Sequence, residues 1–128
     1  MTLQDLLDLE VPSVILFDVD HTLECSSGPV PHSDLRALKE KGHIVGICGN
    51  WAQFVNSEPA WHQLVSILGS FNMTKPDFMR MVRQVVPAQH YVMVGNDEPG
   101  KSEDGIAARE AEWWFVKEDE LVGSVLLT

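Results

Sequence analysis

The chain has 128 residues, of which 45% are hydrophobic, and it carries a formal net charge of −10. This length and composition fit one globular domain that is large enough to bury a core without disulfides or structural metals. The negative charge argues against a protein that binds nucleic acid nonspecifically, because such binding needs a basic face. Any anionic ligand must therefore be met by a local cation, either a metal ion or a few placed lysines.

The cysteines and the N-terminal residues predict where the protein resides. Cys25 and Cys48 match no zinc or redox spacing, so a reducing compartment is the simplest expectation. The first ten residues, MTLQDLLDLE, contain neither the basic stretch of a signal peptide nor a long apolar core. We therefore expect a cytoplasmic protein that does not associate with a membrane.

In chain order, the first half alternates helical and strand patterns. The leucines of residues 3–7 predict a short leading helix, and the uninterrupted apolar run over residues 14–17 predicts a buried strand. Leu35 and Leu38 predict a helix that ends at Gly42, since glycine is favoured just past a helix end. Residues 44–47 predict a second buried strand.

The second half continues the alternation. Apolar residues with helical spacing predict helices over residues 61–68 and 78–85, and the sequence SFNM, residues 70–73, between them is a candidate third strand. The remaining predicted elements are a strand at 91–94, a small-residue helix at 106–111 and a strand at 113–116.

This pattern predicts an α/β fold. Uninterrupted apolar strands are covered on both faces, as in a parallel sheet, and parallel strands joined by helices use right-handed crossovers. We expect a single domain over residues 1–128, a three-layer α/β/α sandwich with a central parallel, Rossmann-like sheet of about five strands.

Polar residues follow three of the predicted strands. Asp18 and Asp20 come directly after the first strand, residues 48–50 (Cys-Gly-Asn) end the second, and residues 95–97 (Gly-Asn-Asp) follow the strand at 91–94. Ligands of open α/β sheets bind at the carboxyl ends of the strands. A single Asp there is more often a turn or cap residue. Clustered carboxylates indicate a bound cation, because like charges repel.

Four segments resemble the motifs of the haloacid dehalogenase-like phosphohydrolases. FDVDHTL is similar to the first motif, GHIVGICGN to the second, TKPDF to the third, and YVMVGNDEPGKSEDGIAAREAE to the fourth. They occur in the family's order and cover residues 14–114. The resemblance implies the family's fold, a phosphatase activity and a Mg²⁺ cofactor.

The resemblance also implies roles for single residues. Asp18 corresponds to the nucleophile that forms an aspartyl-phosphate, and Asp20 to the acid that protonates the leaving alcohol and then activates water. The Asp18 carboxylate and the Asp20 backbone carbonyl would bind Mg²⁺, a hard cation that prefers oxygen ligands. Thr22 would hold the loop after the strand. Lys75, at a helix start where the dipole disfavours a cation, would neutralise the phosphate; Lys101 is a weaker candidate.

Two positions depart from the family pattern. Cys48 replaces the hydroxyl residue of the second motif, so phosphate binding there would depend on the backbone N–H groups of Gly49 and Asn50, and Cys48 is also interpretable as a core residue. In the fourth motif Asn96 stands where an acidic residue is usual, with Asp97 next. The third metal ligand is therefore either Asn96 or Asp97.

The segments that could hold a cap domain, residues 24–32 and 51–74, are too short for one. The site is then open, and a large substrate or a second copy of the chain would have to exclude water from it. Trp51 would stack on a substrate, pack in the core or contact a second subunit. We expect a Mg²⁺-dependent phosphatase acting on a phosphorylated small molecule or a macromolecular phosphate end. The alternative is a weak or inactive domain of this fold that binds a phosphorylated ligand or a protein partner.

Overall fold

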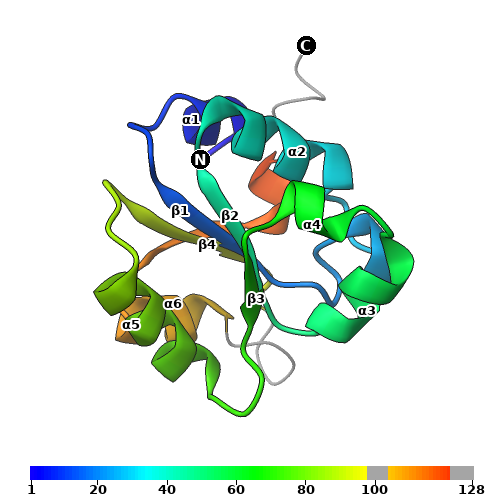
Figure 1. The fold of residues 1–128 in the computed structure, drawn as a ribbon. Coiled ribbons are helices and arrows are strands. Elements are labelled where there is room, and N and C mark those ends of the chain that lie inside the picture. Colours follow the sequence, from blue (N-terminus) through cyan, green and yellow to red (C-terminus); the bar gives the residue numbers. More distant parts are fainter. Residues whose placement is uncertain (98–103, 122–128) are drawn as a thin grey trace.

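The structure, a computed structural model, describes residues 1–97 and 104–121, so that Lys101 lies outside the described residues. Within them, five strands form one parallel sheet in the order β3-β2-β1-β4-β5 (Figure 1). The strands are β1 (Val14–Phe17), β2 (Ile44–Cys48), β3 (Ile67–Gly69), β4 (Tyr91–Gly95) and β5 (Trp114–Lys117). The helices are α1 (Leu3–Leu7), η1 (Glu24–Ser26), α2 (His32–Lys41), α3 (Trp51–Ser57), α4 (Trp61–Leu64), α5 (Lys75–Val85) and α6 (Asp104–Glu110). None of the described helices has the length and apolar character needed to cross a membrane.

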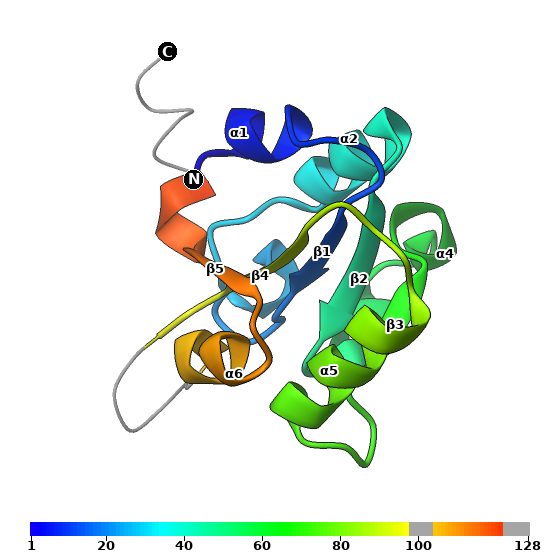
Figure 2. The same cartoon turned by 90° about the vertical axis from the view of Figure 1, so that its left-hand side faces the viewer.

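Helices cover both faces of the sheet, which confirms the predicted three-layer α/β/α architecture (Figure 2). Successive strand residues point to opposite faces. Ile15 and Phe17 of β1 therefore pack in a core with α1 to α4, while Val14 and Leu16 pack in a second core with α5 and α6. All four side chains are fully buried, as expected for a central strand whose sequence is uninterrupted and apolar.

Local sequence signals set the ends of the longer helices. Gly42 ends α2 in the left-handed region, with φ of 111°, and its N–H bonds to the Leu38 carbonyl as the spacing predicted. Thr74 caps α5 by accepting a hydrogen bond from the Asp77 N–H, and Pro76 occupies the first turn, where no N–H is needed. The start of α5 brings Lys75 to the carboxyl edge of the sheet.

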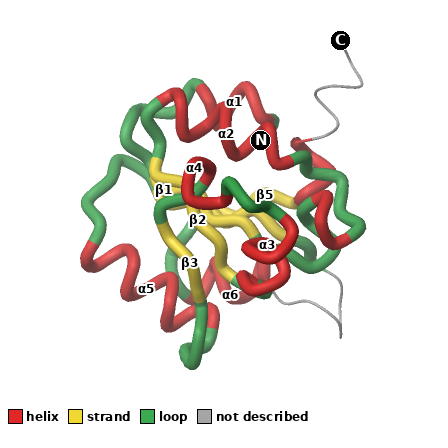
Figure 3. Tube along the Cα trace, turned by 45° about the vertical axis from the view of Figure 1, so that its right-hand side comes forward, coloured by secondary structure: helices red, strands yellow, loops and turns green. Residues whose placement is uncertain are grey.

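Two predicted elements were wrong. The helix expected over residues 61–68 ends at Leu64, and the third strand is Ile67–Gly69 rather than residues 70–73, which form the loop into α5 (Figure 3). Tertiary pairing overrides the helical spacing, because β3 adds to the open edge of β2 and aligns with residues 46–48. Gly46 has no side chain, and the Ile67 side chain fills that space.

Candidate functional site

A buried ion-pair cluster lies where β1, α5 and α6 meet. Asp18 follows β1 and is only 4% exposed, and its N–H bonds to the Val94 carbonyl of β4. The Asp18 Oδ1 atom accepts a hydrogen bond of 3.0 Å from the Nζ of Lys75, and the same Nζ donates to Oδ1 of Asp104 at 2.7 Å. One ammonium group is therefore shared by two carboxylates.

Asp104 is a site residue that the sequence analysis did not identify. It begins α6, is 1% exposed, and its Oδ2 accepts a hydrogen bond from the Asn96 N–H at 3.2 Å. The close approach depends on Gly95, because a Cβ there would lie 2.5 Å from Asp104 Oδ2. Its only sequence signal is an acidic residue at the start of a helix of small residues; its partner Lys75 is 29 residues away.

Burial and charge determine the ionisation of this cluster. Burial raises the pKa of Asp18 from 3.8 to about 6; Lys75 opposes the rise and Asp104 adds to it. Burial also lowers the pKa of Lys75, but attraction by Asp18 and then by Asp104 outweighs it, and the net pKa lies well above its usual range. Lys75 therefore stays charged. Burial makes the ionised form of Asp18 less favourable, and a second cation nearby would reduce this free-energy cost.

Asn96 fills the space beside the second oxygen of Asp18. Its Nδ2 atom lies 3.3 Å from Asp18 Oδ2, 2.7 Å from the Asp20 carbonyl oxygen and 3.2 Å from Thr22 Oγ1. A half-turn of the amide would place its oxygen in the same position. Asp18, the Asp20 carbonyl and Asn96 would then bring three oxygens together, and oxygen is the ligand atom that Mg²⁺ prefers.

This set contains only one carboxylate. Among residues 1–97 and 104–121, no group of three His, Cys, Asp or Glu side chains has the arrangement of a metal site. The structure places the Asp97 side chain against α6, where a Cβ added to Gly105 would lie 2.8 Å from its Oδ2. Of the two residues that the sequence left open as the third ligand, Asn96 is the one beside Asp18 and Asp20.

The Asp20 side chain is exposed and is positioned by two polar neighbours. Its Oδ1 atom accepts hydrogen bonds from Asn50 Nδ2 at 3.3 Å and from Ser26 Oγ at 3.4 Å. Asn50 also donates to Gln53 Oε1, which ties it to α3, and Ser26 ends η1. The Asp20 carboxylate thus faces solvent two residues after the buried Asp18, with partners from two other segments.

The second predicted motif contributes mainly through Gly49. A Cβ on Gly49 would collide with Asp18 Oδ1, so only glycine lets this carboxylate sit against the end of β2. The Gly49 N–H donates to the Gly69 carbonyl at 2.8 Å and is thus engaged with β3. Cys48 is fully buried among apolar residues, and burial raises the pKa of its thiol to about 12. Its position is that of a core residue.

Comparison of the chain with protein-family models, with curated proteins and with solved structures finds no match. What the site can do chemically follows from its own residues. It combines a buried carboxylate paired with an ammonium group, an exposed carboxylate two residues later, and the Asn96 amide between Asp18 Oδ2 and the Asp20 carbonyl oxygen. A carboxylate held beside an ammonium group can act as a nucleophile, and an exposed carboxylate can transfer protons.

Proposed function

We propose that this protein is a Mg²⁺-dependent phosphomonoesterase of the haloacid dehalogenase-like type, with Asp18 as its nucleophile. The observation that carries the proposal is the environment of the two Asp18 oxygens. Oδ1 contacts the Lys75 ammonium group, and Oδ2 faces the position shared by Asn96 and the Asp20 carbonyl. An anionic phosphate and a carboxylate repel each other. Cations on both sides of the carboxylate would offset this repulsion and allow the two groups to come together.

The proposed reaction has two displacements at phosphorus. Asp18 Oδ1 attacks, the bond between phosphorus and the leaving oxygen breaks, and Asp20 gives its proton to the departing alcohol. Asp20 then takes a proton from water, whose oxygen attacks the aspartyl-phosphate and releases inorganic phosphate. The exposed position of Asp20, fixed by Asn50 and Ser26, supports this role because the acid must reach both the leaving group and water.

The residues present fit Mg²⁺. Asp18 Oδ2, the Asp20 carbonyl and the Asn96 amide oxygen would hold it, and it would supply charge neutralisation to the phosphate oxygens. Lys75 would bind the phosphate from the other side, kept in place by Asp104. Because the ligand set has one carboxylate, we expect weak binding, and Asn96→Asp should tighten it. Calorimetric Mg²⁺ titration, which needs no turnover, measures this directly.

The test of the proposed function uses a panel of phosphomonoesters with Mg²⁺ and with excess chelator. Wild type should hydrolyse at least one of them, and only with the metal. Asp18→Asn should abolish turnover, because the amide is nearly isosteric but cannot attack. The matched control is Asp77→Asn, at an exposed carboxylate of α5 paired with Arg80, which should keep full activity. Full activity of Asp18→Asn, or in chelator, would refute the proposal.

The alternative, a domain of this fold that binds a phosphorylated ligand without efficient turnover, also has support. The second motif was predicted to bind phosphate through Cys48 and the N–H groups of Gly49 and Asn50, yet the thiol is buried and the Gly49 N–H is bonded to Gly69. Fewer donors then remain for the phosphate. Mg²⁺-dependent binding of inorganic phosphate, together with no turnover of any ester in the panel, would favour this alternative.

A further inference from the structure

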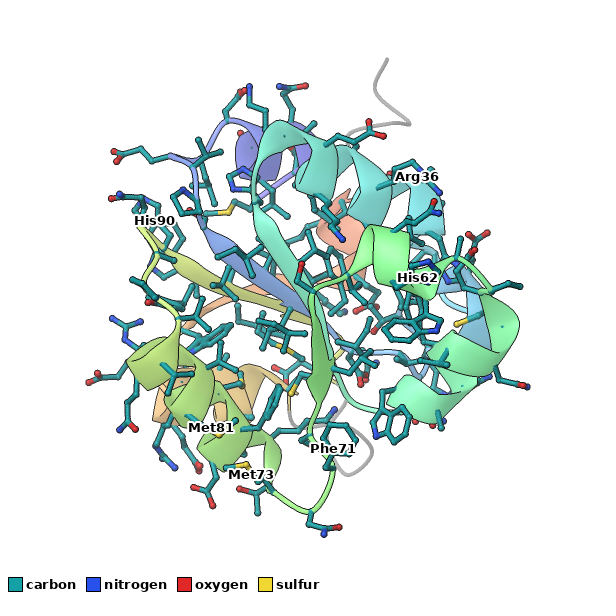
Figure 4. All side chains as sticks on the ribbon, viewed as in Figure 1. Arg36, His62, Phe71, Met73, Met81 and His90 are labelled. Carbon is teal, nitrogen blue, oxygen red and sulfur yellow. The ribbon has the colours of Figure 1, made fainter. Side chains whose placement is uncertain are left out.

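Two aromatic rings contact one another, with tilted planes, in the segments that lead away from the candidate site. Phe71 lies in the loop between β3 and α5, and Trp51 is the first residue of α3. Their ring centres are 4.9 Å apart with an angle of 45° between the planes. Trp51 packs partly against the core, whereas Phe71 is 63% exposed, and Figure 4 shows it beyond the end of β3.

Phe71 occupies a backbone position that suits glycine. The Met73 N–H donates to the Ser70 carbonyl at 3.0 Å and closes a turn in which Phe71 is the first central residue, with φ of 53°. A positive φ at this position strongly favours Gly, Asn or Asp, and it is unusual for a bulky residue. An exposed Phe at this φ is therefore unusual, and its ring lies against that of Trp51.

Each of the two segments that carry the ring pair also carries a residue that contacts Asp18. Gly49, which touches the Asp18 carboxylate, precedes Trp51 by two residues, a reach of about 7 Å at most. Lys75, which donates to Asp18, follows Phe71 by four residues. The two segments are also joined at the sheet edge, where the Gly49 N–H bonds to the Gly69 carbonyl.

We propose that the Trp51–Phe71 pair binds the leaving group of the substrate, and that this leaving group carries an aromatic ring. The inference rests on the proposed phosphatase function and names the substrate class for the same site. Exposed rings attract other rings through offset or edge contacts. An anionic leaving group is disfavoured, because the exposed Asp20 carboxylate is held by Asn50, the neighbour of Trp51.

Such a ring could come from two sources. In an aryl phosphate, such as a phosphorylated phenol, the ring is attached to the phosphate oxygen itself. In a 5′-nucleotide the base lies a ribose away from the phosphate. The test therefore compares phenyl phosphate, a 5′-nucleoside monophosphate and glycerol phosphate, which has no ring, by kcat/KM with wild type, Phe71→Leu and Trp51→Leu.

We expect wild type to prefer one of the two ring-bearing esters, and Phe71→Leu to lower kcat/KM for it roughly 3- to 10-fold, mainly through KM. The rate with glycerol phosphate should not change. Val85→Ala is the control, since Val85 is a similarly exposed apolar residue on α5. This substitution should change kcat/KM neither for the ring-bearing esters nor for glycerol phosphate. The ring-bearing ester whose kcat/KM falls relative to glycerol phosphate in Phe71→Leu shows whether the ring belongs to an aryl phosphate or to a nucleotide base. Equal losses with all three esters would overturn the inference.

A binding measurement separates this inference from the proposed function. Phenylphosphonate and methylphosphonate cannot be hydrolysed, and their affinities for wild type and Phe71→Leu can be compared by calorimetry whether or not the protein turns over any ester. We expect phenylphosphonate to bind more tightly to wild type, with the ratio reduced in Phe71→Leu. If both phosphonates bind equally, or the ratio is unchanged in the variant, the ring pair does not recognise a ring.

Phe71→Gly distinguishes recognition from a purely structural role. Glycine suits the positive φ, so this variant should have an unchanged or raised Tm while it loses the preference for phenylphosphonate. If the pair only stabilises the fold, Phe71→Gly should instead lower the Tm and leave the ratio of the two phosphonate affinities as in wild type. That result would overturn the inference.

Discussion

Replacing Lys75 by methionine tests the charge balance on which the candidate site depends. Methionine keeps a similar length and helix propensity but removes the ammonium group. Asp18 and Asp104 then remain side by side, 4% and 1% exposed, without the cation that both contact in wild type. Two buried carboxylates that lose their shared partner must either repel each other or take up a proton.

The expected cost follows from the geometry. The two contacts measure 3.0 and 2.7 Å and both carboxylates are buried, so removing their partner should destabilise the fold by about 3–5 kcal/mol at about pH 8. At about pH 5 partial protonation of the two carboxylates relieves part of their repulsion, so the loss of unfolding free energy should be smaller. Arg80→Met on the same helix is the matched control: its pair with Asp77 is exposed, and the loss should stay below about 1 kcal/mol at either pH.

Urea unfolding followed by tryptophan fluorescence, without divalent ions, measures these differences. The double variant Lys75→Met/Asp104→Asn should recover part of the loss at the higher pH, because only the Asp18 carboxylate remains, and it keeps the test informative if the single variant does not fold. Two results would refute this account of the cluster. One is that Lys75→Met loses no more unfolding free energy than Arg80→Met, and the other is that its loss is the same at both pH values.

Two further predictions concern Asp18 and Gly69. Because folding raises the pKa of Asp18 from 3.8 to about 6, its contribution to stability is fully present below the lower value and is lost as the pH rises through the higher one. In metal-free urea titrations, the free energy of unfolding of Asp18→Asn should therefore rise relative to that of wild type as the pH passes from 3.8 to about 6. Above that pH the relative gain should be about 3 kcal/mol. A difference that does not change with pH would contradict the raised pKa. Gly69→Ala should destabilise the fold by about 1–3 kcal/mol, because its Cβ would collide with the Phe78 ring. Gly105→Ala should destabilise the fold less, because the atoms nearest to its Cβ would belong to the Asp97 carboxylate, which can move aside. Equal unfolding midpoints for both variants would argue against the collision.

The sequence by itself determined the elements that depend on short-range pattern. Uninterrupted apolar runs located β1 and β2 at their observed starts, and Gly42 marked the end of α2. Because parallel strands carry their polar ends to one edge, the positions of Asp18 and Asp20 beyond β1 were also predictable. These properties follow from side-chain periodicity and backbone preference, which are local to a few neighbouring residues.

The tertiary structure alone decided which side chains meet. The helical spacing near Leu68 did not indicate a strand, because the open edge of β2 determines that pairing. Lys75 bonds to Asp18 across 57 residues and to Asp104 across 29, and no local pattern records such contacts. The exposed fraction of Phe71 likewise depends on the packing around its loop. Distances between segments arise only when the helices pack on the sheet, so the sequence identified candidates for the site, and packing decided which of them became neighbours.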